Sequence, residues 1–260
     1  MSVDACAEMV ARGDPDRALS AMTAPMPGRG DLLVLYAFNL EVARAPWVTK
    51  EPMIAQMRLQ WWADVCDEIA AGAAVRSHEV ATPLAELVRR RRVPVELLAE
   101  IVEARRQDVD MGRLSDDEAL DAYIAATSGN LMAAAATALG ADAAGQDIAR
   151  LAGFASGCAN LIRALPALNA AGRNPLPRSG RDQDAIASIA ARGLQAGAQA
   201  RTGRMALARS ARPAVFAGWQ TVAILNAARR DPDQALAAAW QPSEFGRRAG
   251  LLWCQMTGRF

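Results

Sequence analysis

Three acidic residues are spaced so that they could act together on one face of a helix. Asp64, Asp67 and Glu68 lie at positions i, i+3 and i+4 of a segment with helical periodicity. Carboxylates grouped in this way can hold a hard cation such as Mg²⁺. The alternative, which we favour, is a solvated acidic face beside the apolar side formed by Trp61 and Trp62. We therefore assign neither a metal ligand nor a catalytic residue to this segment.

The other residues capable of chemistry do not form a catalytic set. His78 is the only histidine, so neither a histidine-based metal cluster nor a Ser–His triad is supported. We expect His78 in a solvated loop after Gly72. Asp108 and Asp110 are two residues apart and diverge on a helix, which favours a structural or capping role.

The overall charge gives little reason to expect a polyanionic partner. The chain has 260 residues and a formal net charge of +1, so no nucleic acid is expected. Residues 89–92 are four consecutive arginines that point around a helix. We interpret them as cations at a helix C-terminus, with peripheral contact to an anionic membrane surface as the alternative.

The cysteines and the N-terminal segment predict a cytoplasmic protein. Cys6, Cys66, Cys158 and Cys254 are far apart and form no CxxC pair, so we expect reduced, buried thiols. The first 16 residues contain acidic residues and no apolar stretch typical of a signal or transit peptide. No run of 18 apolar residues occurs, and no transmembrane helix is expected.

Proline, glycine and capping residues divide the chain into helix-sized segments. Capping boxes begin at Ser115 and at Asp231, where an acidic or amide side chain follows three residues later. The expected helices are residues 31–44, 52–71, 83–92, 94–111, 115–139, 145–165, 182–209, 213–230, a short helix after Asp231, and 243–256. Because no segment shows sustained strand alternation, we predict an all-α fold with one domain over residues 1–260. Residues 169–182 are rich in Gly, Pro and Arg and are expected to form either a mobile flap or a recognition loop.

Residues 157–177, GCANLIRALPALNAAGRNPLP, carry the most specific pattern. They resemble a segment of squalene and phytoene synthases, QLTNILRDVxEDxxxGRxYLP. The matching residues are Asn160, Arg163, Gly172, Arg173, Leu176 and Pro177. The acidic residues of the family segment are missing, and Ala164, Ala167 and Leu168 stand at their positions.

Three further segments support the same resemblance. Residues 35–38, LYAF, are similar to the start of the first aspartate-rich motif of the family. Residues 107–110 resemble the segment after its middle helix, and Tyr123 with Ser128-Gly129-Asn130 resembles its Y…AGxVG pattern. The resemblance implies an isoprenoid-synthase-type helical bundle around a central apolar cavity.

The resemblance also indicates which chemistry has been lost. Family enzymes hold Mg²⁺ with aspartates on two facing helices, and the metal neutralises the diphosphate leaving group. In this chain the first set of aspartate positions falls on Ala43, Arg44 and Trp47, and Arg44 would repel a cation. Glu41 lies about 200° away around the helix. Pro166 is a further departure, because proline disfavours helix at the residue before it.

We therefore expect a non-catalytic family member without a cofactor. One branch of the family, the mitochondrial complex I assembly factors with a phytoene-synthase-like domain, also lacks these aspartates. It resembles this chain at residues 37–41, AFNLE, and 57–62, MRLQWW. This implies an assembly or scaffolding role, and we expect a protein partner such as a respiratory-complex subunit, a prenyl lipid in the cavity, and peripheral contact with the inner membrane. The bias to Arg and the lack of a transit-peptide pattern indicate a bacterial relative rather than the mitochondrial protein. The remnant cavity is expected to include Tyr36, Tyr123, Asn160, Arg163 and Arg173.

Two other functions stay open on the sequence. An active prenyl transferase, joining prenyl diphosphates head to head, would need Mg²⁺ and substitute carboxylates, for which Asp64, Asp67 and Glu68 are the first candidates. An arginine-rich nucleic-acid-binding protein would show binding that weakens steeply with salt.

Overall fold

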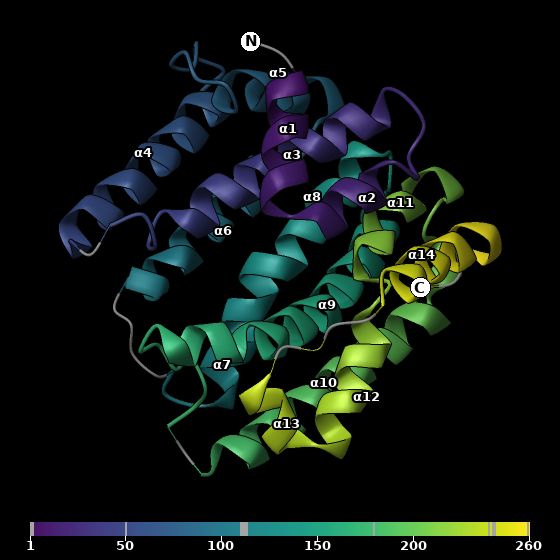
Figure 1. Ribbon diagram of the computed structural model, residues 1–260. Coiled ribbons are helices and arrows are strands. Elements are labelled where there is room, and N and C mark those ends of the chain that lie inside the picture. Colours follow the sequence, from purple (N-terminus) through teal and green to yellow (C-terminus); the bar gives the residue numbers. More distant parts are fainter. Residues whose placement is uncertain are drawn as a thin grey trace.

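The computed structural model describes residues 3–49, 51–109, 114–178, 180–238, 240, 243–258 and 260. Every regular element within these ranges is helical (Figure 1), which confirms the all-α prediction. The α-helices are α1 Val3–Gly13, α2 Pro15–Ala21, α3 Gly28–Arg44, α4 Pro52–Ala70, α5 Ala81–Arg91, α6 Val95–Arg105, α7 Asp117–Ile124, α8 Asn130–Ala138, α9 Ala143–Ala170, α10 Asp182–Thr202, α11 Arg212–Val215, α12 Thr221–Arg230, α13 Pro232–Ala237 and α14 Glu244–Thr257. Short 3-10 turns are η1 Arg106–Val109, η3 Arg204–Ala206, η4 Arg209–Ala211 and η5 Phe216–Gly218, and η2 Ala125–Gly129 is a π-helix.

Helix α9 is the central element of the bundle (Figure 1). It packs against α8, α10 and α12. Among the described helices it is the one with the length and hydropathy to cross a membrane, but half of its most apolar window is buried inside the bundle. Its apolar side chains, such as Ile162 and Leu165, therefore form part of the protein core.

The prediction that Pro166 interrupts this helix is wrong, because α9 continues to Ala170. Proline removes one backbone donor near the end of the helix, but the last turn has other bonds. The N–H of Arg173 donates to the carbonyl of Leu168 at 2.9 Å, and Gly172 has a positive φ of 74°. This is the Schellman arrangement that closes a helix, so Gly172 of the family-like segment has a structural role here.

The helix expected over residues 115–139 consists of three elements. Its cap is Asp116, whose carboxylate accepts a hydrogen bond from the N–H of Ala119 at 2.8 Å. The cap therefore lies one residue after the predicted Ser115, and α7 begins at Asp117. The π-helix η2 then separates α7 from α8. It lies directly on α9, because a Cβ built on Gly153 would be 2.6 Å from the carbonyl oxygen of Ser128.

Two arginines of residues 89–92 bind one buried carboxylate. Arg90 Nη2 is 2.6 Å from Asp31 Oδ1, and Arg91 Nε is 2.7 Å from Asp31 Oδ2. The side chain of Asp31 is 4% exposed in the first turn of α3. The arginines therefore connect the C-terminal end of α5 to the N-terminal end of α3, as expected for cations at the end of a helix.

His78 lies in the loop after Gly72, as predicted, but its ring is half-buried against two tryptophans rather than solvated. Its ring centroid lies 4.9 Å from that of Trp61 and 5.4 Å from that of Trp62. Its Nδ1 accepts hydrogen bonds from the N–H groups of Val80 and Ala81, at 3.1 and 3.4 Å. The imidazole therefore satisfies backbone donors at the start of α5, where unpaired N–H groups are otherwise left.

All four cysteines are free and buried, as predicted. Burial raises the pKa of Cys66 and of Cys158 to about 12, and that of Cys6 to about 11. The thiols therefore stay protonated at neutral pH, and their sulfur atoms are shielded.

This burial predicts slow alkylation of the native protein. At pH 8 the thiolate fraction of Cys66 and Cys158 should be about 1,000-fold below that of a free cysteine, since each pKa unit is a factor of ten. Mass spectrometry after iodoacetamide treatment should find almost unmodified native protein and fourfold modification in guanidinium. Modification of the native protein at the rate of glutathione would contradict this prediction.

Candidate functional site

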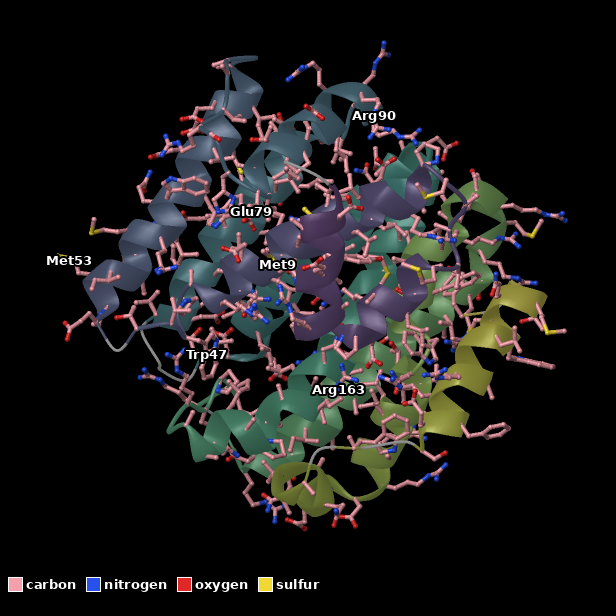
Figure 2. The ribbon with its side chains drawn as sticks, turned by 45° about the horizontal axis from the view of Figure 1, so that its top comes forward. Met9, Trp47, Met53, Glu79, Arg90 and Arg163 are labelled. Carbon is pink, nitrogen blue, oxygen red and sulfur yellow. The ribbon has the colours of Figure 1, made fainter. Side chains whose placement is uncertain are left out.

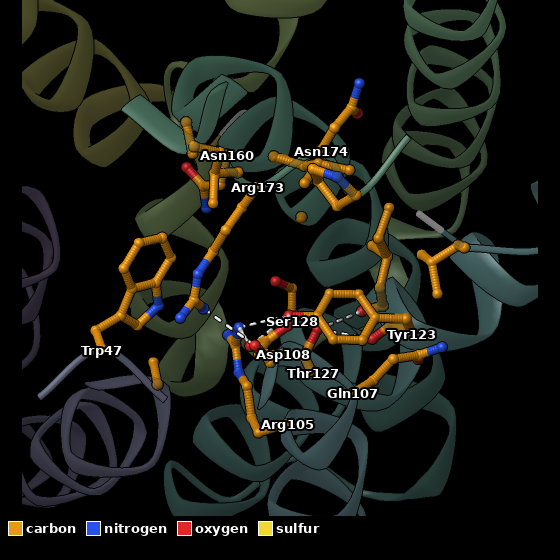
Figure 3. A pocket seen from close by; sticks show the side chains of 18 residues that line it. Trp47, Arg105, Gln107, Asp108, Tyr123, Thr127, Ser128, Asn160, Arg173 and Asn174 are labelled. Carbon is orange, nitrogen blue, oxygen red and sulfur yellow. Dashed lines mark hydrogen bonds and ion pairs between the residues drawn. The ribbon is translucent and has the colours of Figure 1, made fainter. Parts of the chain in front are cut away.

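A cavity of about 300 Å³ opens between the end of α3, η1, α7, η2 and α9 (Figure 3). Its lining residues are Ala43, Trp47, Arg105, Gln107, Asp108, Leu114, Tyr123, Ile124, Thr127, Ser128, Gly157, Asn160, Leu161, Ala164, Leu168, Arg173, Asn174 and Pro175. Apolar side chains make up much of this wall, and polar groups are concentrated around Arg105 and Asp108 (Figure 3). A volume of this size is at the lower end of the range of small-molecule pockets, about 300–1,000 Å³.

Four positions on this wall are those at which the resemblance places metal-binding carboxylates. Ala43 and Trp47 come from the end of α3 and the turn after it, and Ala164 and Leu168 are one turn apart on α9. None of the four side chains has an oxygen, so these residues do not fit Mg²⁺. The predicted repulsion by Arg44 has no structural basis, because Arg44 is exposed and does not line the cavity.

Three residues of the polar part of the wall form a hydrogen-bonded network. Arg105 Nη1 donates to Asp108 Oδ2 at 3.0 Å and to the Tyr123 hydroxyl at 2.6 Å. The Tyr123 hydroxyl donates to Asp108 Oδ1 at 2.8 Å (Figure 3). Burial, together with the Asp108 carboxylate, raises the pKa of Tyr123 well above its ordinary value, so the phenol stays neutral. Asp108 thus has a structural role, as expected, while Asp110 lies outside the described residues.

Arg173 crosses the mouth of the cavity. Its Nη1 donates to the backbone carbonyl of Asp108 at 3.0 Å, and its Nη2 donates to that of Pro46 at 2.9 Å. Its guanidinium lies 4.0 Å from the centre of the Trp47 ring (Figure 3). The loop after α9 is therefore connected to the end of α3 without a metal ion.

A second cavity of about 270 Å³ adjoins the first and is more polar. The two cavities share four lining residues, which are Ala43, Arg105, Ser128 and Asn160. The additional wall of the second cavity comes from the start of α2, from α9 and from the segment before α12. Asp16 lies in this wall and binds Arg163 of α9 and Arg247 of α14.

The predicted cavity residues have different positions in the structure. Tyr123, Asn160 and Arg173 line the first cavity, and Asn160 and Arg163 line the second. Tyr36 lines neither cavity, since it is 2% exposed in the core. Burial raises the pKa of Tyr36 to about 12.

Sequence reasoning missed several lining residues. Asp14, Asp16, Arg105 and Gln220 all reach a cavity. A local signal existed only for Asp14, which precedes a proline and caps α2 by accepting a hydrogen bond from the N–H of Arg17.

The acidic residues on α4 pair with an arginine. Arg76 donates to Glu68 Oε1 from Nε at 3.0 Å and lies 3.7 Å from Asp64 Oδ2, while Asp67 is exposed. Within the described parts of the chain, no group of three His, Cys, Asp or Glu side chains is arranged to hold a metal ion.

Sequence comparisons relate the chain to two kinds of protein. The sequence model described as squalene/phytoene synthase matches residues 10–183. The bovine and human proteins named NADH dehydrogenase (ubiquinone) complex I, assembly factor 6, are 27% and 26% identical to the chain over 162 residues. This matched segment is 62% of the chain and 48% of each relative, so it spans about half the length of these relatives.

Solved structures show the same fold. A dehydrosqualene synthase in complex with ligand has a TM-score of 0.83 at 14% identity, over 98% of this chain and 95% of that chain. The squalene synthase HpnC from Alicyclobacillus acidocaldarius has a TM-score of 0.77 at 18% identity, over 91% of this chain and 95% of its own. The likeness confirms the predicted isoprenoid-synthase type of helical bundle.

Proposed function

The chain belongs to the squalene/phytoene synthase family, and from this premise we propose that it is a non-catalytic member that assists the assembly of a respiratory complex. The observation that carries the proposal is the absence of any carboxylate at Ala43, Trp47, Ala164 and Leu168, which line one cavity. A prenyl diphosphate ionises only when the charge of its leaving group is neutralised, for which the family uses Mg²⁺. With methyl, indole and isobutyl groups there, these four positions offer no oxygen to such a metal, and Asp108, the one carboxylate among the described residues of the wall, is paired with Arg105.

The similarity to complex I assembly factor 6 supports a role in assembly rather than in lipid synthesis. It extends over 162 residues, which is 62% of the chain. We propose that the partner is a protein subunit of a respiratory complex. The loss of carboxylates at Ala43, Trp47, Ala164 and Leu168, together with the retained fold, supports a binding function.

We extend the proposal to the ligand and to the place of action. An isoprenoid chain would contact the apolar wall of the first cavity, which includes Ile124, Leu161 and Leu168. The protein would act in a bacterial cytoplasm and touch the inner membrane. Exposed apolar residues after α3 and in the first two turns of α4 support this contact, namely Trp47, Val48, Met53, Ile54 and Met57. Figure 2 shows Trp47 and Met53 on the same side of the molecule.

An assay of diphosphate release tests the loss of catalysis. The purified chain is incubated with farnesyl or geranylgeranyl diphosphate and Mg²⁺, beside an active squalene synthase. We expect release at the level of a protein-free control, while circular dichroism shows a folded helical protein. Metal-dependent turnover would refute the proposal and support a prenyl transferase instead.

The assembly role has its own test. Deletion of the gene in its host should reduce the fully assembled NADH dehydrogenase on a native gel, and the wild-type gene should restore it. A crosslinked complex captured with the tagged chain should contain a subunit of that enzyme. Normal assembly in the deletion strain would contradict the assembly role without bearing on the loss of catalysis.

A further inference from the structure

The carboxylate of Asp16 is bound from three directions. Its Oδ2 accepts hydrogen bonds from Arg163 Nη1 at 3.0 Å and from Gln220 Nε2 at 2.9 Å. Its Oδ1 accepts one from Arg247 Nη1 at 2.7 Å. The side chain of Asp16 is 17% exposed. A carboxylate held by two guanidinium groups and an amide occupies a site with the donors that an anionic ligand would need.

The other arginines of the second cavity are also paired with carboxylates of the chain itself. Arg17 Nη1 lies 2.6 Å from Asp14 Oδ2, and Arg105 Nη1 lies 3.0 Å from Asp108 Oδ2. Together with Arg163, these are the arginines that line this cavity. A phosphate or diphosphate entering the second cavity would therefore find its cations compensated and would be repelled by Asp14 and Asp16.

Uncharged polar groups lie in the same wall, and one of their atoms has no partner among the described residues. Gln220 is 8% exposed, and its Oε1 is buried without a hydrogen-bond partner. Asn39, which is 6% exposed, and Thr221, which is 8% exposed, line the same cavity. A buried acceptor without a partner is unfavourable, so the Gln220 Oε1 favours a ligand that donates a hydrogen bond.

The two cavities adjoin, and their walls differ in polarity. The first offers apolar side chains such as Ile124, Leu161 and Leu168, and the second offers amide and hydroxyl groups. We propose that the joined cavities bind an amphiphile with an uncharged, hydrogen-bonding head group, and that Asp16 sets this preference by occupying the site of an anion. That the ligand's tail is an isoprenoid rests on the proposed function. The choice of an uncharged head group rests on the paired charges of the second cavity's wall.

Titration calorimetry without divalent metal tests this preference. The ligands are farnesol, farnesyl diphosphate and inorganic diphosphate, and the proteins are the wild type, Asp16→Asn and Asp121→Asn. Asp121 pairs with Arg192 and lines neither cavity, so Asp121→Asn removes the same charge at an unrelated site. We expect the wild type to bind farnesol at least tenfold more tightly than farnesyl diphosphate.

Asp16→Asn should release Arg163 from its carboxylate, while Arg247 keeps its second partner, Glu244. The affinity of this variant for inorganic diphosphate should rise at least tenfold over that of the wild type, while Asp121→Asn should stay within threefold. An unfolded variant could not gain affinity, so a gain would not reflect misfolding.

Two results would overturn the proposal. The first is a wild type that binds farnesyl diphosphate as tightly as farnesol or binds neither, and the second is an Asp16→Asn variant that gains no affinity for diphosphate. Either result would leave the non-catalytic assembly role intact, because that role is tested by turnover and by assembly of the respiratory complex.

Discussion

Replacing Gly153 with alanine is expected to lower the free energy of unfolding by about 3 kcal/mol, the upper end of the usual cost of overpacking. A Cβ at this position would lie 2.6 Å from the carbonyl oxygen of Ser128 and 2.9 Å from the Cα of Gly129. Both are backbone atoms of the π-helix η2, so no side-chain rotation can relieve the clash. Helix α9 and η2 would have to move apart, and the cavity wall formed by Thr127 and Ser128 would move with them.

Urea unfolding of Gly153→Ala and of Gly197→Ala measures this effect against a matched control. Gly197 also lies within a helix, but its nearest neighbours would be 3.4 Å away at Arg201 Nη1 and 3.5 Å away at the Cβ of Ala155. There alanine meets ordinary contacts and has a helix propensity better by about 1 kcal/mol, so Gly197→Ala should be neutral or stabilising. Similar losses in both variants would show that the close approach of α9 and η2 does not limit stability.

The close contact between Gly153 of α9 and η2 explains why the π-helix could not be predicted from the sequence. The sequence around residues 125–129 continues a helical pattern, and nothing local distinguishes a π turn from an α turn. The glycines that permit the close contact, Gly153 and Gly157, are on another helix more than 20 residues away. By contrast, the cap at Asp231 depends on neighbouring residues, and its predicted bond to the N–H of Gln234 is present at 2.9 Å.

The residues of the candidate site also fall into those that a local sequence pattern indicated and those that depend on contacts between distant parts of the chain. Asn160, Arg163 and Arg173 stand in one family-like segment, so a single sequence pattern indicated them, and all three line a cavity. Asp16 lies outside any such pattern. Its partners Arg163 and Arg247 are 147 and 231 residues away in the chain, and periodicity carries no information about contacts over such separations. Tyr36 was indicated by a motif but is turned into the core, because a motif fixes the helix and not the direction of each side chain.

Returning carboxylates to the cavity wall is expected to make the stability of the fold depend on Mg²⁺. The variant is Ala43→Asp, Ala164→Asp and Leu168→Asp; Trp47 is left in place because Arg173 packs on its ring. Without metal, three carboxylates in one largely apolar cavity repel each other and lose hydration, so the variant should be several kcal/mol less stable. Mg²⁺ at 100 times its dissociation constant should restore about 2.7 kcal/mol. Thermal unfolding with and without Mg²⁺ measures this recovery.

The matched control replaces the same residues with asparagine, as Ala43→Asn, Ala164→Asn and Leu168→Asn. Asparagine has nearly the shape of aspartate but no charge, so any loss from size or polarity should be shared and only the metal response should differ. A Mg²⁺-dependent rise confined to the aspartate variant would mean that α3 and α9 still hold the geometry of a metal site. The missing chemistry would then follow from side chains alone, since the backbone that positions them has been kept. Equal responses of the two variants would mean that these positions no longer converge, and that the loss of catalysis involves the fold as well.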